Sequence, residues 1–402
     1  MRVKWKLIGR VALAAAALAG AALVWKRDEL ARLYRVNTLF AEDRIVDNFM
    51  HMDRLFWTVP VPRGDGPVRP LPADPRPLPQ TFRHDWGEER VEDYLARSAT
   101  TALIVLKDGR IAHESYRLGT RPENLRISWS MAKSVTATLI GVALAEGAID
   151  SIDDPADKYA PALAQGAYGG VSIRDLLHMS SGVDFDENYA DFNSDINKMG
   201  RTLALGGSMD AFAAGQERRV APAGENFRYV SVDTHALAMA LRGATGRSLP
   251  QYLSEKLWGP MGAEAEARFV TDGHGAAFAL GGLNARARDY ARFGLLIAEG
   301  GAWNGRRIVP AEWIDAMGRP SAPPPAPGST ERYGYGLHWW IPPDAAPGEM
   351  VARGVYGQWI YVNRPERVVI VKTSADRNFM KEDRRANYEA AAFFRAVTAA
   401  LR

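Results

Sequence analysis

The chain of 402 residues contains no cysteine and only seven histidines. Without cysteine, disulfide bonds and a lipid-modified N-terminal cysteine are excluded. The histidines are scattered, no His-Glu-x-x-His pair occurs, and each histidine is interpreted as structural. The sequence therefore predicts no metal site.

Several sequence motifs of enzymes and binding proteins are also missing. No Gly-x-Ser-x-Gly elbow occurs, so an α/β-hydrolase nucleophile has no candidate. There is no Gly-x-x-x-x-Gly-Lys loop, and Gly334–Trp339 lacks the third glycine of a dinucleotide fingerprint. The net charge is only +3, and the basic residues form no stripe. We therefore expect no cofactor and no nucleic-acid partner.

Long apolar runs are rare, and the one at the N-terminus follows four basic residues within the first ten positions. Val11–Trp25 carries no charge, but its 15 residues span only about 22 Å of a hydrocarbon core of about 30 Å. When the flanking residues are included, the segment is nearly long enough to cross that core. The pattern predicts a signal anchor over residues 1–26 in the inner membrane of a bacterium, with the catalytic domain in the periplasm. Cleavage near Ala19-Gly20-Ala21 is the alternative and would leave a periplasmic protein.

The remaining chain divides into an extension over residues 27–81 and one domain over residues 82–402. The first part of the extension has the pattern of an amphipathic helix, and its proline-rich second part is typical of a linker or extended arm. In the domain, Asp108-Gly109 predicts a hairpin turn, strands flank residues 363–366, and an alanine-rich helix covers residues 385–401. Strands at both ends imply an α/β (α+β) fold, in which an antiparallel sheet is flanked by helices and a mostly helical subdomain is inserted.

The most informative motif is Ser130-Met131-Ala132-Lys133, the only Ser-x-x-Lys in the chain. Positions three apart share one face of a helix, so Lys133 is expected one turn from the Ser130 hydroxyl. The following stretch is apolar nearly all round and predicts a buried helix. Burial lowers a lysine pKa, and an amine so tuned can take a proton from serine near neutral pH. Ser130 is therefore the candidate nucleophile and Lys133 its base.

These residues resemble a known family. Ser-x-x-Lys opens the active-site helix of the penicillin-recognising serine hydrolases, which include β-lactamases, DD-peptidases, esterases and amide hydrolases. The segments 172–183 ("SIRDLLHMSSGV") and 277–294 ("AFALGGLNARARDYARFG") are similar to further family motifs. The class C β-lactamase branch, and within it the 6-aminohexanoate-dimer hydrolases, gives the nearest resemblance through 352–362 ("ARGVYGQWIYV"). The resemblance implies a β-lactamase/transpeptidase-like fold.

The family's other motifs imply roles for further residues. A Tyr-x-Asn or Tyr-x-Ser motif matches Tyr229 and Ser231, so Tyr229 is the expected proton shuttle and Ser231 a substrate-binding candidate. The third motif matches the stretch ending in Gly354, where a glycine lets the backbone approach the substrate. By resemblance, the oxyanion hole comprises the N–H groups of Ser130 and Val355.

The chain departs from β-lactamases at Ala352, where they carry a cationic or aromatic residue that helps to hold an anionic substrate. Arg353 cannot simply replace that residue, because successive strand side chains face opposite ways. Ester or linear amide substrates are therefore favoured. In the related amide hydrolases an acidic loop lies near the substrate, so Tyr189 and Asp191, with Asp195, are candidates for binding a substrate amine.

The sequence thus predicts a membrane-associated serine hydrolase acting on a small-molecule amide or ester. A β-lactamase or DD-peptidase is the alternative within the same chemistry. A catalytically silent binding module of the cell envelope is the alternative of another class. The physiological substrate, the oligomeric state and the fate of the N-terminal segment stay open.

Overall fold

The computed structural model describes residues 27–380 and 385–402. The predicted signal anchor, residues 1–26, lies outside the described part of the chain. Within that part, no helix combines the length and the apolar character that crossing a membrane requires.

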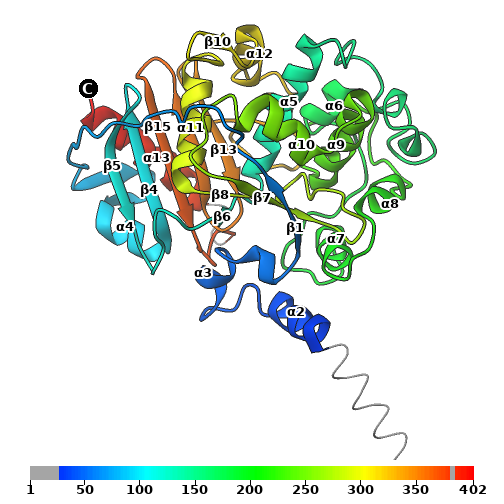
Figure 1. Ribbon diagram of the computed structural model, residues 1–402, viewed down its shortest axis with the longest axis horizontal. Coiled ribbons are helices and arrows are strands. Elements are labelled where there is room, and N and C mark those ends of the chain that lie inside the picture. Colours follow the sequence, from blue (N-terminus) through cyan, green and yellow to red (C-terminus); the bar gives the residue numbers. More distant parts are fainter. Residues whose placement is uncertain (1–26, 381–384) are drawn as a thin grey trace, which may run out of the picture.

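A seven-stranded antiparallel sheet forms one half of the described structure (Figure 1). Its strands, in spatial order, are β11 (Gly334–Tyr335), β12 (Trp340–Ile341), β13 (Glu349–Gly354), β14 (Gln358–Asn363), β15 (Val368–Ser374), β4 (Thr100–Lys107) and β5 (Arg110–Tyr116). The hairpin predicted at Asp108-Gly109 joins β4 to β5, and both turn residues have positive φ. Strand β15, near the C-terminal end of the domain, pairs with β4, near its N-terminal end, so that both ends of the domain contribute to one sheet, as the sequence predicts.

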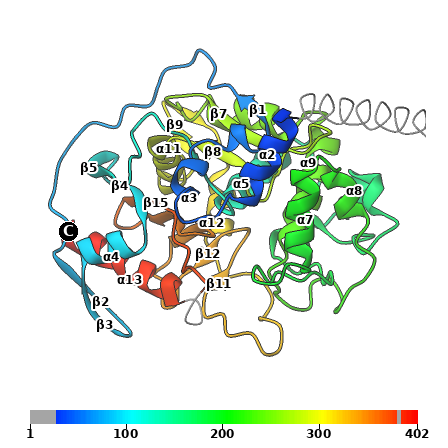
Figure 2. The same cartoon turned by 90° about the horizontal axis from the view of Figure 1, so that it is seen from below.

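Both faces of this sheet are covered by helices. Successive side chains along each strand point to opposite faces, so they enter two different clusters. Ile104 packs in the core cluster shared with α11 (Ala287–Ala298), whereas Leu103 packs in the cluster shared with α13 (Arg385–Ala400). Figure 2 shows these two helices on opposite sides of β4 and β15. Helix α11 approaches closely at Gly294, where an added Cβ would lie 2.6 Å from Val369 Cγ1.

The inserted part of the chain is mostly helical, as predicted, and lies beside the sheet (Figure 1). Its two longest helices, α5 (Met131–Ala145) and α9 (Ser231–Thr245), are buried on nearly every side and pack against each other. Around them lie η2 (Ala156–Lys158), η3 (Pro161–Leu163), α6 (Ile173–Leu177), α7 (Asp195–Ala204), α8 (Met209–Ala214), α10 (Leu249–Leu253), the π-helical turn η4 (Ser254–Trp258) and α12 (Ala311–Met317).

A second, four-stranded antiparallel sheet joins the two halves. Its strands, in spatial order, are β1 (Trp57–Val61), β7 (Ala267–Thr271), β8 (Leu283–Ala285) and β6 (Arg126–Ile127). Strand β6 is followed directly by α5. The start of this buried helix therefore lies at the boundary between the two halves. Two small hairpins lie elsewhere, β2 (Thr81–His84) with β3 (Gly87–Arg90), and β9 (Ala302–Trp303) with β10 (Arg306–Arg307), and α4 (Val91–Arg97) precedes β4.

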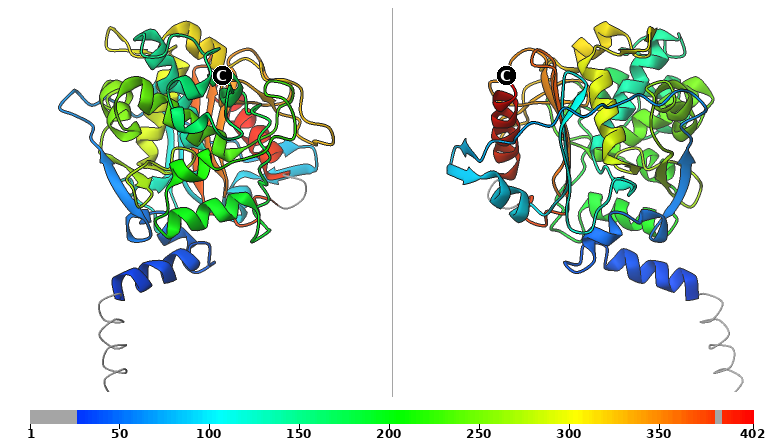
Figure 3. Two further views of the ribbon diagram at one scale, coloured as in Figure 1. Left: turned by 90° about the vertical axis from the view of Figure 1, so that its right-hand side faces the viewer. Right: turned by 60° about the vertical axis from the view of Figure 1, so that its left-hand side comes forward.

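The extension packs against the domain along much of its length (Figure 3). The amphipathic pattern forms α2 (Arg27–Asn37), α3 (Ile45–Asn48) and the turn η1 (Met52–Arg54) rather than one continuous helix. The break lets the chain fold back, so that Leu39 within the break and Phe49 after it both reach the main core. After them β1 pairs along its whole length with β7.

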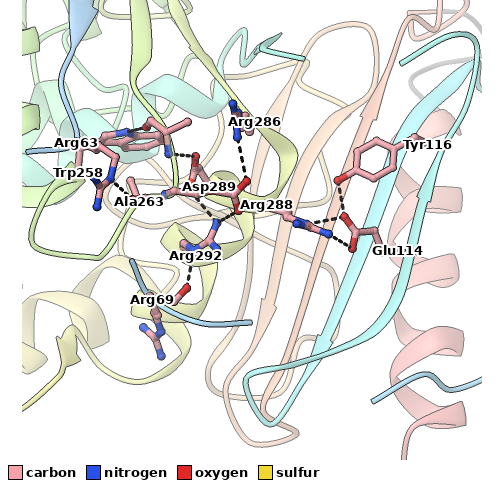
Figure 4. Close-up of polar contacts among 12 residues, drawn as sticks. Arg63, Arg69, Glu114, Tyr116, Trp258, Ala263, Arg286, Arg288, Asp289 and Arg292 are labelled. Atoms are coloured by element: carbon pink, nitrogen blue, oxygen red, sulfur yellow. Dashed lines mark hydrogen bonds and ion pairs between the residues drawn. The ribbon is translucent and has the colours of Figure 1, made fainter. Parts of the chain in front are cut away.

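Helix α11 also holds the proline-rich part of the extension through polar contacts (Figure 4). The Asp289 carboxylate accepts backbone N–H bonds from Glu264 and Ala265 and an ion pair from Arg292, 3.0 Å away. Arg292 Nε donates to the carbonyl of Arg69 in the extension at 2.9 Å. Buried polar groups need such partners, so this network fixes the extension against the domain.

Candidate active site

Ser130 lies at the junction of the two halves, at the N-terminus of α5. Strand β6 pairs with β8, and the N–H of Ser128 donates to the carbonyl of Leu283 at 2.8 Å. Trp129 then takes a positive φ of 43°, which turns the chain sharply into the helix. Ser130 is the N-cap residue of α5 and is half-buried. The free N–H groups and positive dipole end of a helix N-terminus favour negative charge at this position.

Lys133 lies one turn further along α5, with its side chain buried and directed at Ser130. Its Nζ donates to Ser130 Oγ at 3.1 Å, to Ser231 Oγ at 3.2 Å and to the carbonyl of Leu280 at 3.1 Å. Burial lowers the pKa of the amine from 10.5 to about 8, while the carboxylates of Glu187 and Asp233 act in the opposite direction. A measurable fraction of the amine is therefore neutral near pH 7 and able to accept a proton.

Tyr229 faces the same lysine from the segment that leads into α9. The Lys133 Nζ lies 5.1 Å from the centroid of the Tyr229 ring, and that ring stacks on Trp340 at 5.4 Å between centroids. The approach is set by a backbone hydrogen bond of 2.8 Å from the N–H of Arg228 to the carbonyl of Met179. The predicted motif segment 172–183 thus supports the loop that carries Tyr229.

Gly354 and Val355 pass close to the start of α5 at the end of β13. A Cβ added at Gly354 would lie 2.6 Å from the Ser128 carbonyl oxygen and 3.0 Å from the Ser130 nitrogen, so only glycine permits this approach. In the described residues, no turn or loop hydrogen bond uses the N–H of Ser130 or Val355 as donor. The two groups are therefore available to an incoming oxygen atom.

A cavity of about 270 Å³ opens over these groups. Ser130, Tyr229, Gly354, Val355 and Tyr189 all line it. Of the other predicted site residues, Lys133 and Ser231 lie buried behind the wall. Lys133 reaches it through its hydrogen bond to Ser130, and Ser231 contacts Lys133 in turn. The structure thus brings together most of the residues that the motifs single out.

The acidic loop is arranged differently from the expectation. Asp191 is exposed, does not line the cavity, and accepts the N–H of Asn193 in its own loop, while Asp195 pairs with Lys198 at 2.9 Å. Glu187 lines the cavity instead. Its carboxylate accepts the Ser231 hydroxyl, the Ser231 N–H at 3.0 Å and the Tyr189 hydroxyl at 2.8 Å. A loop has no side-chain period, so the sequence could not select Glu187 from among its acidic neighbours.

A comparison with models of protein families identifies the family of the chain. Residues 88–393 match the family model described as Beta-lactamase. The chain belongs to the beta-lactamase family.

A curated relative supports a hydrolase within this family. The chain is 29% identical over 295 residues to the 6-aminohexanoate-dimer hydrolase of Paenarthrobacter ureafaciens, with 71% of this chain and 75% of the relative covered. Together with the family match, this makes the chain a serine hydrolase of the beta-lactamase family.

Solved structures share the beta-lactamase fold. A Bacillus anthracis protein described as a candidate 6-aminohexanoate-dimer hydrolase superposes with a TM-score of 0.79 at 24% identity, covering 90% of this chain and 95% of its own. A penicillin-binding protein homologue from Pyrococcus abyssi gives a TM-score of 0.58 at 21% identity, covering 77% and 75%. The predicted β-lactamase/transpeptidase-like architecture is therefore confirmed.

Ala352, where β-lactamases carry a cationic or aromatic residue, does not face the cavity in this chain. Ala352 is fully buried in the main core and does not line the cavity. Arg353 does line it, but its guanidinium pairs with Glu331 at 2.7 Å and lies 3.5 Å above the Trp340 ring centroid. Arg353 is thus held by Glu331 and Trp340, while its Nη1 has no hydrogen-bond partner among the described residues.

Lys372 is a second buried lysine of the cavity wall, and the sequence analysis missed it. Its Nζ donates to Ser374 Oγ at 2.8 Å, and burial lowers the pKa of the amine from 10.5 to about 7. The sequence did contain a signal for this residue. Lys372 lies on the same face of β15 as the buried Val368 and Ile370, and a lysine at such a position is unusual.

One group of potential metal ligands occurs among the described residues. Ligand atoms of His84, Glu89 and Glu389 lie within 4.8 Å of one another. Arg97 donates to Glu89 and Glu389 at 2.7 Å each. The guanidinium thus takes the place that a cation would need, and these residues do not fit a metal.

Proposed function

We propose that the chain hydrolyses ester or linear amide bonds through an acyl-enzyme on Ser130. The observation that carries the proposal is the buried Lys133 amine, 3.1 Å from the Ser130 hydroxyl, with a pKa lowered to about 8. A base poised near the working pH combines a sufficient neutral fraction with sufficient basicity.

In the first half-reaction, neutral Lys133 takes the proton of Ser130 Oγ as that oxygen bonds to the substrate carbonyl carbon. The carbonyl oxygen becomes an oxyanion, which the N–H groups of Ser130 and Val355 stabilise. Tyr229 relays the proton that Lys133 took up to the leaving alcohol or amine, the bond from the carbonyl carbon to the leaving group breaks, and Lys133 is neutral again.

In the second half-reaction, water attacks the acyl carbon and gives up a proton to the same base. The Ser130 oxygen leaves with a proton, the carboxylic acid departs, and the free enzyme is restored. Glu187 holds Ser231 and Tyr189 in place beside the base through its three hydrogen bonds. No step needs a metal or an organic cofactor.

The preference for ester or linear amide substrates rests on the environment of β13. Ala352 offers no charge to the cavity, and Arg353 is already paired with Glu331. A β-lactamase or DD-peptidase, the alternative in the same chemistry, would lack a cation at the position of Ala352 to help hold its anionic substrate. The curated relative named for the 6-aminohexanoate dimer, a linear amide, favours the same choice.

The test is the intact mass of the full chain after exposure to a fluorophosphonate, with Ser130→Ala as the matched control. We expect one adduct on the wild type and none on the variant. Unlabelled wild-type protein is then assayed with p-nitrophenyl esters, the 6-aminohexanoate dimer and nitrocefin. Turnover of nitrocefin alone would favour the β-lactamase alternative. A folded wild type without adduct would reject the hydrolase mechanism and favour the silent envelope module.

We also propose that residues 1–26 attach the enzyme to the bacterial inner membrane, with the catalytic domain in the periplasm. Support comes from the basic start followed by Val11–Trp25. Membranes from expressing cells are washed with alkaline carbonate. Retention in the pellet is expected for an anchor, whereas release of a shortened chain would indicate a cleaved signal.

A further inference from the structure

Five aromatic rings from distant parts of the chain form one cluster beside Ser130. Phe40 of the extension stacks on Tyr356 with centroids 4.8 Å apart and planes 12° apart. Phe49 contacts the edges of Trp129 at 5.5 Å and of Tyr356 at 5.4 Å. Phe379, which lines the cavity, lies 4.5 Å from Tyr356. We call Phe40, Phe49, Trp129, Tyr356 and Phe379 the aromatic cluster.

Two members of the aromatic cluster flank the two N–H groups of the proposed oxyanion hole. Trp129 directly precedes Ser130, and Tyr356 directly follows Val355. Both have positive φ, 43° at Trp129 and 61° at Tyr356, a conformation that L-residues with large side chains rarely adopt. Such a backbone persists only where its surroundings hold it.

Polar contacts also join the extension to the segments that neighbour these two residues. The N–H of Ile127, at the end of β6, donates to the Phe49 carbonyl at 3.1 Å, and Arg126 Nη1 donates to the Val46 carbonyl at 2.9 Å. Near the other end of the cluster, Glu42 pairs with Arg377 at 2.8 Å. The extension thus contacts the segment before Ser130 and the loop that carries Phe379.

We propose that Phe40 and Phe49 are positioning residues, which fix the N–H groups of Ser130 and Val355 through the rings of Trp129 and Tyr356. The inference rests on the proposed function, because it assigns a task within the same reaction. Both phenylalanines precede residues 88–393, the part that matches the family model. The extension is accordingly part of the catalytic apparatus of this chain and not only a connection to the membrane.

The test uses Phe40 in the full chain, because its side chain is 41% exposed and its removal spares the core. Phe40→Ala removes the ring that stacks on Tyr356. Losing one oxyanion donor outright costs about 10²–10³ in kcat. We therefore expect partial misalignment to lower kcat for a p-nitrophenyl ester by about tenfold, with KM within about twofold of the wild type.

Two further variants separate positioning from general stability. Phe40→Tyr keeps a flat ring and should restore kcat. Tyr34→Ala removes another exposed aromatic ring of the same extension that has no ring contact with the cluster, and it should leave kcat unchanged. Thermal unfolding is measured for each variant. If Phe40→Ala is destabilised, Phe40→Leu, which keeps an apolar side chain without a ring, is compared with Phe40→Tyr instead.

The outcomes distinguish this inference from the proposed function. A wild-type enzyme that is active and is labelled at Ser130 in a separate sample, together with an unchanged kcat in Phe40→Ala, would overturn the positioning role alone. A rise in KM without loss of kcat would also overturn it, since the oxyanion hole acts mainly on the transition state. Wild-type protein that is neither labelled nor active would reject the proposed function itself.

Discussion

At the scale of single residues, burial and hydrogen-bonding geometry decide the chemistry of this site. A serine hydroxyl and a lysine ammonium are unreactive toward each other in water, where the lysine stays protonated. In the folded chain Lys133 is almost inaccessible to solvent and lies 3.1 Å from Ser130 Oγ. Desolvation disfavours the charged amine and lowers its pKa to about 8, into the range that its proposed role as base requires.

The first expected result is a pH dependence of ester hydrolysis. Only the neutral Lys133 amine can accept the Ser130 proton, and its pKa is about 8. The value of kcat/KM should therefore rise with pH through an apparent pKa near 8, falling about tenfold per pH unit on the acid side. Initial rates between pH 5.5 and 9.5 measure this profile. Rates that stay flat from pH 6 to 9 would contradict the assignment of Lys133 as base.

A second expectation concerns Glu187→Gln. The negative charge of Glu187 raises the pKa of Lys133, so a neutral amide at the same position lets the pKa fall further. The acid limb of the profile should move to lower pH, whereas the maximal rate should fall because the bonds to Ser231 and Tyr189 weaken. The profile of the variant is compared with that of the wild type. A limb that moves to higher pH would contradict the electrostatic role of Glu187.

At the scale of elements, the site depends on how closely strand β13 approaches the start of helix α5. The end of β13 runs directly into a turn whose central residues, Tyr356 and Gly357, both have positive φ. Because Gly354 pairs with Gln358, the loop between the two strands has three residues, 355–357. Gly354 then permits the contact with Ser128 and Ser130 that a side chain would prevent.

Gly354→Ala tests this approach. The new Cβ would lie 2.6 Å from the Ser128 carbonyl oxygen, so β13 and the start of α5 must separate. We expect kcat to fall by about 10²-fold, as on loss of an oxyanion donor. Gly200→Ala is the control, because an added Cβ meets nothing within 4 Å and alanine favours helix α7. Equal activity of Gly354→Ala and wild type would show that the contact is dispensable.

At the scale of the whole molecule, the extension and the family domain form one packed structure. Phe49, Met52 and Leu55 are buried in the main core, and β1 pairs with β7. A fully buried Phe truncated to Ala typically loses about 3–5 kcal/mol of stability. The segment from residue 45 to residue 61 is therefore bound to the domain by its own apolar side chains and not merely tethered to it.

Hydrogen exchange of the full chain checks this coupling. The backbone amides of β1 should be protected nearly as strongly as those of β7, because the two strands share hydrogen bonds and unfold together. The exposed part of α2 serves as the internal comparison and should exchange faster. Exchange of β1 at the rate of α2 would mean that the extension opens independently of the domain.

The sequence predicted the fold class and the central residues of the site, because these depend on local patterns. Ser130 and Lys133 share a helix turn, Asp108-Gly109 forms its hairpin, and the terminal strands close one sheet. The acidic loop could not be predicted in the same way: the sequence analysis selected Asp191, whereas Glu187 lines the cavity. Both lie in one irregular loop, and only the contacts with Ser231 and Tyr189 select Glu187 for the cavity.

By itself, the sequence determined that Ser130 and Lys133 share one helix turn and that an antiparallel sheet carries a helical insertion, because helix and strand periods place neighbouring residues without knowledge of the rest. Its motifs indicated the family of the chain. Only the tertiary structure decided the neighbours of that pair: Gly354 against Ser130, Glu187 beside Lys133, and Phe40 against Tyr356. These partners are separated by tens to hundreds of positions. Their contacts arise from packing between elements, which no local period encodes.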